Sequence, residues 1–333
     1  MPQGTVTGPL FFLLYINDLP AKLVSKSRLF ADDSVMYKTA KTTEGLRPFQ
    51  DDLNNLEGWQ DDWGMSFNAD KCFVMKISNK PQPPDRQYTF CGKELQVVTS
   101  HPYLGIEIDK KISWKPHIDN TTAKANKVLG CLRRNLWFCS RRVKETAYKT
   151  LVLPILEYGS TAWGPYQENQ ITRLEAVQRK AARFCMSDYK QKSSVTKMIT
   201  ELGWETLDDR RKKKRLTMMY KISNELVGIN KGEHLKPIIN SKTRKKNSMN
   251  YHPIYARLNT YKHSYFPRTI HEWNTLGDST VTATSIDAFK DKLDNPGDPP
   301  TTDASTTTAT TTTTDTSTAT STSTEDHQGR LHN

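Results

Sequence analysis

The sequence predicts an α+β fold in which a mixed segment is followed by a helical region and a disordered tail. Up to about residue 115, short apolar or alternating runs typical of strands stand between helical stretches, whereas beyond His117 apolar residues recur every three or four positions. Residues 297–333 are dominated by Thr, Ser, Asp and Pro and hold too few large apolar side chains to offset the entropy of ordering. We therefore expect a mixed segment at 1–117, a helical region at 118–296 and a disordered tail at 297–333.

Two helices are expected in the mixed segment. The apolar run Leu10–Leu19 predicts a buried helix that ends at Pro20. The stretch Glu44–Trp63 predicts an amphipathic helix, because its apolar residues follow one another at steps of three and four. These residues are Leu46, Phe49, Leu53, Leu56, Trp59 and Trp63. Gly64 is expected to end this second helix.

Strand-like runs make up the rest of the mixed segment. The runs Arg28–Ala31 and Ser34–Tyr37 are apolar or β-compatible and flank an Asp-Asp dipeptide, which predicts two strands joined by a two-residue turn at that dipeptide. Further strands are expected at Phe73–Ile77 and Tyr103–Ile108, with the Pro-rich stretch Pro81–Pro84 as a loop between them.

The region after His117 is predicted to be a series of helices. Its first helix has one apolar face formed by Ile118, Ala125, Val128, Leu132 and Leu136. Further helices are expected to start near Ser140, Glu168, Ser194 and Thr206. Pro154 should kink or break the helix that starts near Ser140.

Positive charge is concentrated in these helices. The chain of 333 residues has a formal net charge of +12, and residues 120–222 alone hold 22 Lys and Arg against 9 Asp and Glu. Such an excess favours a phosphate-rich partner, although an ordinary solvated helical surface gives a similar pattern.

Other function classes are disfavoured by what the sequence lacks. The five cysteines are odd in number, widely spaced and without a Cys-x-x-Cys pair, which argues against a disulfide framework or a zinc module. The longest N-terminal apolar run is far shorter than the ~20 residues of a membrane span, and no basic stretch precedes it. We expect an intracellular protein of the nucleus or cytoplasm without a membrane partner.

Adjacent carboxylates are the strongest chemical signal, because nucleotidyl transfer needs hard oxygen ligands for Mg²⁺. The chain has four such pairs: Asp32-Asp33, Asp51-Asp52, Asp61-Asp62 and Asp208-Asp209. The last three fall where an exposed helix face or a helix start explains them. Only the first pair lies between two strand-like runs, so it is the candidate metal site. The alternative is a structural turn, in which Asp is common.

Several short motifs surround this pair in a definite order. They are Met1–Leu10 (MPQGTVTGPL), Leu14–Leu19 (LYINDL), Phe30–Asp33 (FADD), Trp63–Asn68 (WGMSFN) with Lys71-Cys72, and Tyr103–Ile106 (YLGI). Later segments follow: Glu145–Tyr148, Leu156–Tyr158, Gln178–Phe184, and Phe266–Ile270 with Trp273-Asn274. Together these motifs resemble the palm and C-terminal motifs of non-LTR, jockey-like retrotransposon reverse transcriptases. The resemblance runs from Pro2 to about Leu293 and implies a truncated polymerase palm at 1–117 followed by a basic helical thumb and C-terminal region.

The resemblance implies roles for individual residues. Asp32 and Asp33 would form the metal side of the catalytic centre, with Asp32 binding Mg²⁺ and Asp33 supporting the turn and the field of the ion. Lys71 would act near the nucleotide phosphates, where an ammonium stabilises charge or donates a proton. Gln3 and Gly4 would lie against the template and the incoming nucleotide. The alternatives without a catalytic role are a solvated side chain for Lys71 and a helix-entry turn for Gln3 and Gly4.

A primer-binding element is implied by the same resemblance. Tyr103, Leu104 and Gly105 would place the primer end, with a plain core strand as the alternative. The partners of such an enzyme are an RNA template, a DNA primer and deoxynucleotides.

One run of six basic residues stands out in the helical region. It consists of Arg210, Arg211, Lys212, Lys213, Lys214 and Arg215. On a helix these side chains spread around most of the circumference, so some face solvent in any case. We favour a solvated or phosphate-facing helix over a nuclear localisation signal.

The sequence departs from the family pattern before Asp32. A complete palm has an earlier strand with another metal-binding Asp, preceded by fingers, and these do not fit in the residues before Asp32. Asp18 is the only acid there, and it falls in the predicted helix. Three hypotheses follow: an RNA-directed DNA polymerase fragment that is inactive alone, a non-catalytic nucleic-acid-binding remnant, or a functionless element relic that does not fold stably.

Overall fold

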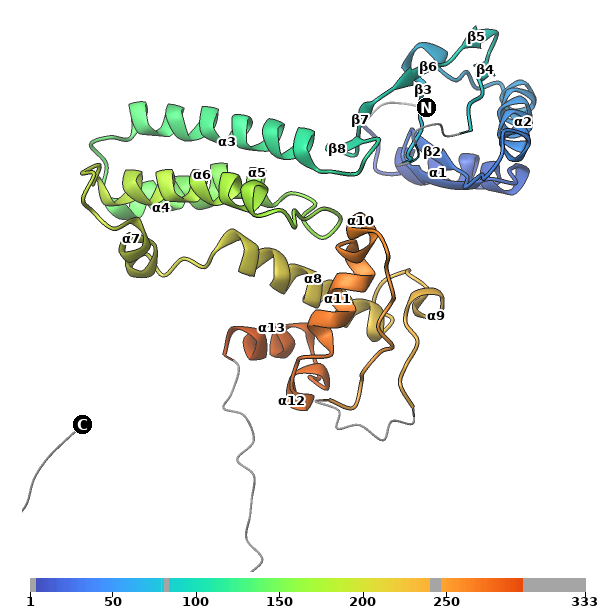
Figure 1. The fold of residues 1–333 in the computed structure, drawn as a ribbon. Coiled ribbons are helices and arrows are strands. Elements are labelled where there is room, and N and C mark those ends of the chain that lie inside the picture. Colours follow the sequence, from blue (N-terminus) through green and yellow to red (C-terminus); the bar gives the residue numbers. More distant parts are fainter. Residues whose placement is uncertain (1–3, 79, 81–83, 240–246, 296–333) are drawn as a thin grey trace, which may run out of the picture. The chain divides into compact units, whose positions relative to one another are not determined.

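The computed structural model describes residues 4–78, 80, 84–239 and 247–295, all of which belong to one unit of the chain, Met1–Asn295. The predictions for Gln3, for most of the Pro81–Pro84 loop and for the tail at 297–333 concern residues outside these ranges. The architecture is mixed α+β: among the described residues, the named strands all lie before Trp114, and helices joined by loops follow it (Figure 1). Within the described ranges, no helix combines the length and the apolar character that a membrane span requires.

Among its described residues, the mixed part contains two α-helices and eight short strands, besides short 3₁₀ turns. The helices are α1 (Gly8–Ile16) and α2 (Arg47–Trp63). The strands are β1 (Lys26–Phe30), β2 (Asp33–Tyr37), β3 (Phe73–Met75), β4 (Thr89–Phe90), β5 (Lys93–Glu94), β6 (Gln96–Val98), β7 (Ser100–Tyr103) and β8 (Ile106–Asp109). They form four two-stranded sheets: β1 with β2, β4 with β5 and β7 with β8 are antiparallel, and β3 with β6 is parallel.

Helix α2 organises the core of this part. Its residues Leu53, Leu56 and Trp59 are buried, as the sequence pattern predicts, and pack with Ile16 of α1 and Phe90 of β4. Its last turn ends at Gly64, which takes the left-handed conformation (φ 63°) that a residue without a Cβ adopts at least cost. The predicted stop at Gly64 is therefore confirmed.

Helix α1 differs from its prediction. The helix ends at Ile16, and Pro20 lies inside a separate 3₁₀ turn, Leu19–Lys22. Only Ile16 is buried, whereas Leu14 is 66% exposed and Leu10, Phe11 and Leu13 are also exposed. The expectation of a buried helix was wrong for the described residues, because a uniformly apolar run specifies burial only where a neighbour covers it.

The helical part begins at Lys115. Its helices are α3 (Lys115–Asn135), α4 (Arg141–Ala147), α5 (Leu153–Glu157), α6 (Glu168–Met186), α7 (Val195–Glu201), α8 (Leu207–Ser223), α9 (Lys231–His234), α10 (Asn259–Lys262), α11 (Tyr265–Trp273), α12 (Asp278–Val281) and α13 (Ile286–Asp294). The predicted starts near Ser140, Glu168, Ser194 and Thr206 are confirmed. The interruption expected at Pro154 is present as a π-helical turn, Tyr148–Val152, between α4 and α5.

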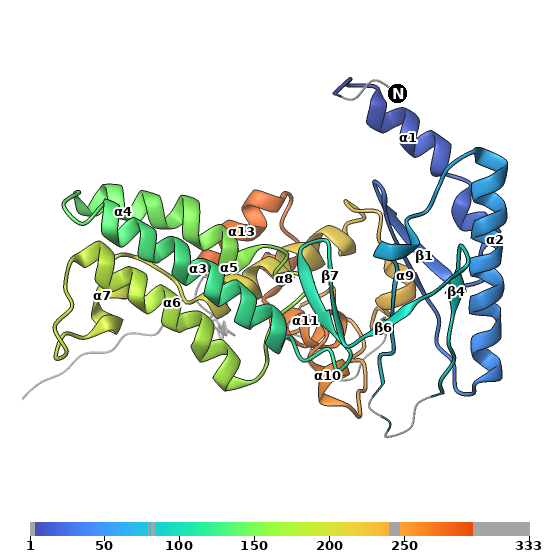
Figure 2. The same cartoon turned by 90° about the horizontal axis from the view of Figure 1, so that it is seen from above.

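Two cores fill the helical part, and α8 belongs to both. The first core packs α3 against α5 and α6 around residues such as Ile118, Leu156 and Leu174, and it includes Leu207 at the start of α8. The second core joins Tyr220 near the end of α8 to side chains of α11 and α13, namely Ile270, Trp273 and Phe289. Figure 2 shows α3, α4 and α6 running side by side, with α8 continuing toward α11.

Asp52 is a buried carboxylate rather than part of an exposed helix face, which corrects the expectation for the Asp51-Asp52 pair. It is fully buried and accepts hydrogen bonds from the backbone N–H groups of Val24 and Ser25, both at 2.8 Å. Asp51, Asp61 and Asp62 are exposed, as predicted. The adjacent carboxylates of this helix therefore have different environments, and Asp52 ties α2 to the chain before β1.

Replacing Asp52 with Ala should destabilise the protein by about 2–4 kcal/mol, because two backbone donors lose their acceptor away from water. Asp51→Ala is the matched control and should change stability by no more than about 0.5 kcal/mol, since that side chain is exposed. Urea unfolding of both variants measures the difference. Equal midpoints would show that the Asp52 contacts contribute nothing to the fold.

Candidate functional site

The β1–β2 hairpin carries the Asp32-Asp33 pair at its tip. Phe30 and Asp33 are the last paired residues, so the turn consists of Ala31 and Asp32, and Asp33 is the first residue of β2. Ala31 takes a positive φ of 51°, a conformation that a two-residue hairpin turn requires but that is unfavourable for alanine. The predicted hairpin is confirmed, but its turn lies one residue earlier than expected.

This shift separates the two carboxylates. Because successive residues of a strand point to opposite faces, Asp33 follows the pleat of β2 while Asp32 stands on the turn. Both side chains are exposed, so a cation could reach them. Carboxylate oxygens suit Mg²⁺ in kind, but no group of three or more His, Cys, Asp or Glu side chains in the described ranges is placed to hold a metal ion. The described residues therefore do not complete a metal site.

The other acid before the hairpin, Asp18, has a structural contact. Its Oδ1 accepts a hydrogen bond of 3.1 Å from the indole N–H of the buried Trp59. This contact fastens the end of α1 to α2. The Asp18 carboxylate thus has a structural partner.

Lys71 lies on a short 3₁₀ turn, Ala69–Lys71, that follows α2. Asn68 begins this turn by accepting a hydrogen bond from the backbone N–H of Asp70 at 3.1 Å. Phe67 fixes the segment between α2 and this turn, because its ring packs in the core and its backbone N–H donates a hydrogen bond of 2.7 Å to the Gln60 side chain. The ammonium group of Lys71 is thereby carried on an ordered turn and remains exposed.

Gly4 is also exposed, with a φ of +90° and no heavy atom within 4 Å of where a Cβ would stand. Its conformation favours glycine, but the space around it does not demand one. Gln3 lies outside the described residues.

Tyr103, Leu104 and Gly105 form a hairpin turn, which corrects the prediction of a single strand at Tyr103–Ile108. Tyr103 pairs with Ile106, and the two residues between them both have positive φ values, 47° at Leu104 and 77° at Gly105. This is the backbone pattern of a tight two-residue hairpin turn. The sequence missed it because Leu104 is an unusual residue at a positive φ.

The two hairpins are within electrostatic reach of each other. Burial raises the pKa of the Tyr103 hydroxyl, and the negative charge of Asp33 raises it further, whereas the positive charge of Arg28 on β1 lowers it. Asp33 and Arg28 of the first hairpin are thus close enough to Tyr103 to influence its pKa. Among the described residues, no hydrogen bond or ion pair joins Lys71 or Gly4 to either hairpin.

Helix α5 and the turn after it hold the β7–β8 hairpin. Tyr158 donates a hydrogen bond of 3.1 Å from its hydroxyl to the backbone carbonyl of Leu104, and a Cβ at Gly105 would stand 3.1 Å from the Tyr158 ring. Gly159 approaches β8 even more closely, because a Cβ there would come within 2.7 Å of the Ile106 side chain. The Leu156–Gly159 segment thus fixes the turn that carries Leu104 and Gly105.

His117 makes a second connection between β8 and the helices. The buried ring accepts a hydrogen bond of 3.2 Å on Nδ1 from the backbone N–H of Glu107 and packs edge-on against Trp163, with 4.4 Å between ring centroids. Burial lowers the pKa of His117, and nearby Lys124 also lowers it while Glu107 opposes the shift. The neutral ring that accepts this hydrogen bond is therefore the favoured form.

The basic run on α8 is largely engaged within the protein. Arg211 and Arg215 are buried, and Arg215 forms an ion pair of 2.7 Å with Glu272. Arg210 and Lys214 both bind Glu157, the latter at 2.9 Å. Of these six residues, only Lys212 is exposed, whereas the others are half-buried or buried. A helix with charge on all sides buries two of its arginines here because it passes between two cores.

Glu157 accepts hydrogen bonds from Arg210 and Lys214, a role that the sequence analysis did not predict. Burial alone would raise the pKa of its carboxyl group, but hydrogen bonds and charges from Arg210 and Lys214 outweigh burial and lower the pKa below its ordinary value. Its place in the Leu156–Tyr158 motif was a signal, but nothing in that motif indicates a partner more than fifty residues later. Arg268 was missed in the same way: it binds Glu272 at 3.3 Å and donates to the Pro165 carbonyl at 3.2 Å.

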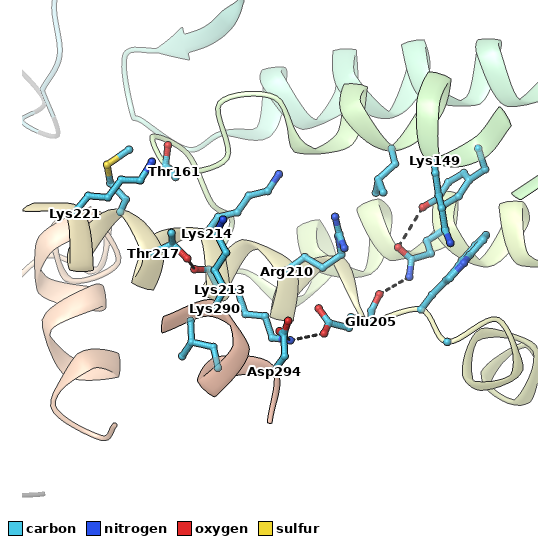
Figure 3. A pocket seen from close by; sticks show the side chains of 17 residues that line it. Lys149, Thr161, Glu205, Arg210, Lys213, Lys214, Thr217, Lys221, Lys290 and Asp294 are labelled. Carbon is cyan, nitrogen blue, oxygen red and sulfur yellow. Dashed lines mark hydrogen bonds and ion pairs between the residues drawn. The ribbon is translucent and has the colours of Figure 1, made fainter. Parts of the chain in front are cut away.

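A basic cleft of about 770 Å³ opens beside α8. Figure 3 shows its charged lining, with Lys213 bonded to both Glu205 and Asp294. Its cations are Lys149, Arg210, Lys213, Lys214, Lys221 and Lys290, and its acids are Glu205 and Asp294. One wall is aromatic, because Tyr148 stacks on Trp204 with 4.4 Å between centroids. The excess of cations makes the cleft suitable for a phosphate group.

Comparison with known proteins finds a family and several relatives to which the chain is similar. Residues 1–108 match the protein family described as reverse transcriptase (RNA-dependent DNA polymerase). The chain is 29% identical over 202 residues to the probable RNA-directed DNA polymerase from transposon BS of Drosophila melanogaster, which covers 55% of this chain and 22% of that protein. It is 28% identical over 197 residues to the corresponding protein of transposon X-element from the same species, covering 55% of this chain and 21% of the relative.

A third relative is the RNA-directed DNA polymerase from mobile element jockey of Drosophila melanogaster, with 26% identity over 202 residues, 55% of this chain and 21% of the relative. The chain thus spans about a fifth of the length of these relatives. No solved structure matches it.

The connection through His117 should weaken in acid. Because burial lowers its folded-state pKa below 6.5, the unfolded chain takes up the proton more readily, so the stabilisation is complete above pH ~6.5 and is lost as the pH falls through the folded pKa. Hydrogen exchange at the Glu107 amide should therefore accelerate in this window, relative to the intrinsic rate. His117→Asn is the control and should remove the additional pH dependence. Unchanged protection of Glu107 across the window would contradict this role.

Proposed function

We propose, from the premise that this chain carries a reverse transcriptase segment of the non-LTR, jockey-like retrotransposon type, that it supplies part of the centre of an RNA-directed DNA polymerase. In this proposal Asp32 contributes a carboxylate to the catalytic Mg²⁺ ions and Asp33 supports its turn. The observation that carries the proposal is that Asp32 stands exposed on the turn of the β1–β2 hairpin, within the segment 1–108 that matches the reverse transcriptase family.

The remaining parts of the proposed site lie on the elements described above. Tyr103, Leu104 and Gly105 contact the primer end, and Lys71 acts on the nucleotide phosphates. Gln3 and Gly4 face the template and the incoming nucleotide. The substrates are an RNA template, a DNA primer and deoxynucleotides, and the place of action is the nucleus or cytoplasm.

The proposed enzyme is incomplete in this chain. Two-metal nucleotidyl transfer needs more carboxylate ligands than the described residues bring together. We therefore propose that the chain does not polymerise alone and that polypeptide of the kind found in its longer relatives supplies the missing ligands.

Primer extension tests the proposal in two settings. The purified chain with an RNA template, a DNA primer, deoxynucleotides and Mg²⁺ should give no product. A chimera in which residues 4–295 replace the corresponding segment of a jockey-type polymerase should extend the primer, and Asp32→Ala in that chimera should lower the rate by about a thousandfold or more, the order of magnitude lost when a major electrostatic contribution to catalysis is removed.

Asp51→Ala is the matched control in the chimera, because it removes one exposed carboxylate of another Asp-Asp pair. Its extension rate should equal that of the unsubstituted chimera. Full activity of the Asp32→Ala chimera, or a chimera that binds primer and template but extends nothing, would contradict the proposal. Extension by the purified chain alone would refute its incompleteness.

A second candidate function is nucleic-acid binding without catalysis, which the cation-rich cleft favours. The contacts would come from two groups of the Arg210–Arg215 run: Lys213 and Lys214, which line the cleft, and Lys212, which is exposed beside it on the same helix. Binding should then weaken steeply with salt, because each phosphate contact releases counterions. Affinity that is retained in Asp32→Ala together with inactivity of the chimera would favour this candidate over the polymerase, whereas no retention on nucleic acid at low salt would exclude it.

A further inference from the structure

One end of the first helical bundle presents aromatic and basic side chains together. We call this surface the bundle tip and define it by Arg133, Arg134, Trp137, Phe138, Arg142, Tyr189, Lys190 and Lys192, all of which are exposed. They come from the end of α3, the connection between α3 and α4, the beginning of α4, and the connection between α6 and α7. Both views show these segments at the same end of the bundle (Figure 1 and Figure 2).

The aromatic side chains of the bundle tip are unusually accessible. Trp137 and Phe138 are each 72% exposed and pair edge to face with 5.9 Å between ring centroids, and Tyr189 is 52% exposed. Exposure of indole and phenyl rings to water is unfavourable in free energy, and most apolar residues on protein surfaces stand singly. Two adjacent rings with a third on the neighbouring connection therefore indicate a surface that receives a partner.

Specific contacts hold these segments in place. The Arg133 guanidinium lies over the Tyr189 ring at 5.0 Å, which links α3 to the connection after α6. Lys144 of α4 donates to the Ser187 hydroxyl at 2.6 Å. Arg183 donates to the backbone carbonyls of Lys190 at 3.0 Å and Ser193 at 3.3 Å. The aromatic groups thus stand on an ordered support, which limits the entropy lost on binding.

The cations of the bundle tip differ from those of α8 in being unneutralised. Among the described residues, no ion pair joins Arg133, Arg134, Arg142, Lys190 or Lys192 to a carboxylate. Glu145 and Glu201 bind Arg141 instead, and Asp188, the one carboxylate in the connection between α6 and α7, accepts the Lys190 backbone N–H at 3.0 Å. The tip therefore carries net positive charge around its rings.

We infer that the bundle tip binds single-stranded RNA. Unpaired bases stack on exposed aromatic rings while cations follow the phosphates, and this combination distinguishes a single strand from a duplex, whose bases are covered. An anionic partner fits the charge better than an apolar protein surface does. The choice of RNA over DNA rests on the proposed function, in which RNA is the template strand and the bundle tip gives that strand a contact separate from the Asp32 turn.

Fluorescence anisotropy with the full chain and an unstructured oligouridine of about 15 nucleotides, close to the upper size of a single binding site, tests this inference. Combined Trp137→Ala and Phe138→Ala should weaken binding at least about tenfold, as expected for the loss of one or two stacked bases. Trp137→Tyr with Phe138→Tyr should retain most of the affinity because stacking is preserved. Tyr255→Ala, which removes a ring that is 84% exposed elsewhere, is the matched control and should bind as the original chain does.

The charged residues have their own readout. Arg134→Ala with Arg142→Ala should reduce the slope of log affinity against log salt by roughly 1.4, since each phosphate contact on a single strand contributes about 0.7. Lys236→Ala, an exposed lysine outside the tip, should leave the slope unchanged. Circular dichroism and urea midpoints equal to those of the original chain establish that the variants are folded.

Several outcomes would overturn the inference: unchanged RNA affinity in the double aromatic variant, tighter binding of single-stranded DNA than of RNA of equal length, an equal loss on duplex RNA, or a defect seen only in sedimentation with anionic lipid vesicles. The variants leave Asp32 and the β7–β8 hairpin unaltered. A negative result here is therefore distinguishable from failure of the polymerase proposal, which is measured by the Asp32→Ala chimera.

Discussion

The close approach of Gly159 to β8 is the constraint on which the arrangement of the proposed primer site depends. No side chain fits between this glycine and Ile106 without displacing one of them. Two of the three residues before it connect the same segment to the helical part, because Leu156 lies in the first core and Glu157 binds two cations of α8. The third, Tyr158, donates a hydrogen bond to the turn of the β7–β8 hairpin. Four consecutive residues thereby join a hairpin, a core and a long helix.

This connection gives the basic helical part a role beyond attraction of phosphate. Arg210 and Lys214 of α8 neutralise Glu157, and Arg215 binds Glu272, so a substantial share of the positive charge stabilises the protein itself. Buried arginines need such partners, because desolvation of an unpaired guanidinium is costly. At the bundle tip, by contrast, no ion pair among the described residues neutralises the cations Arg133, Arg134 and Arg142. The number of cations in a region is therefore a weaker guide to nucleic-acid contacts than their pairing.

Much of the local structure could be predicted from the sequence because local signals determine it. Gly64 ends α2, Thr206 caps α8, and the Asp32-Asp33 hairpin lies between two β-compatible runs. Signals that depend on distant residues failed: Asp52 is buried by contacts with a segment more than twenty residues away, and the acid that pairs with the buried Arg215 of α8 lies more than fifty residues away. The Leu104-Gly105 turn was missed because a leucine at positive φ carries no turn signature.

Hydrogen exchange at the Tyr103 and Ile106 amides in Gly159→Ala and Gly203→Ala tests most directly whether the helical part holds the proposed primer-binding turn. Both glycines have a positive φ, 60° and 63°, so both substitutions strain the backbone, but only a Cβ at Gly159 meets Ile106. Faster exchange of the hairpin amides in Gly159→Ala, with near-original protection in Gly203→Ala, is the predicted result. Equal protection of the hairpin in the two variants would contradict the account.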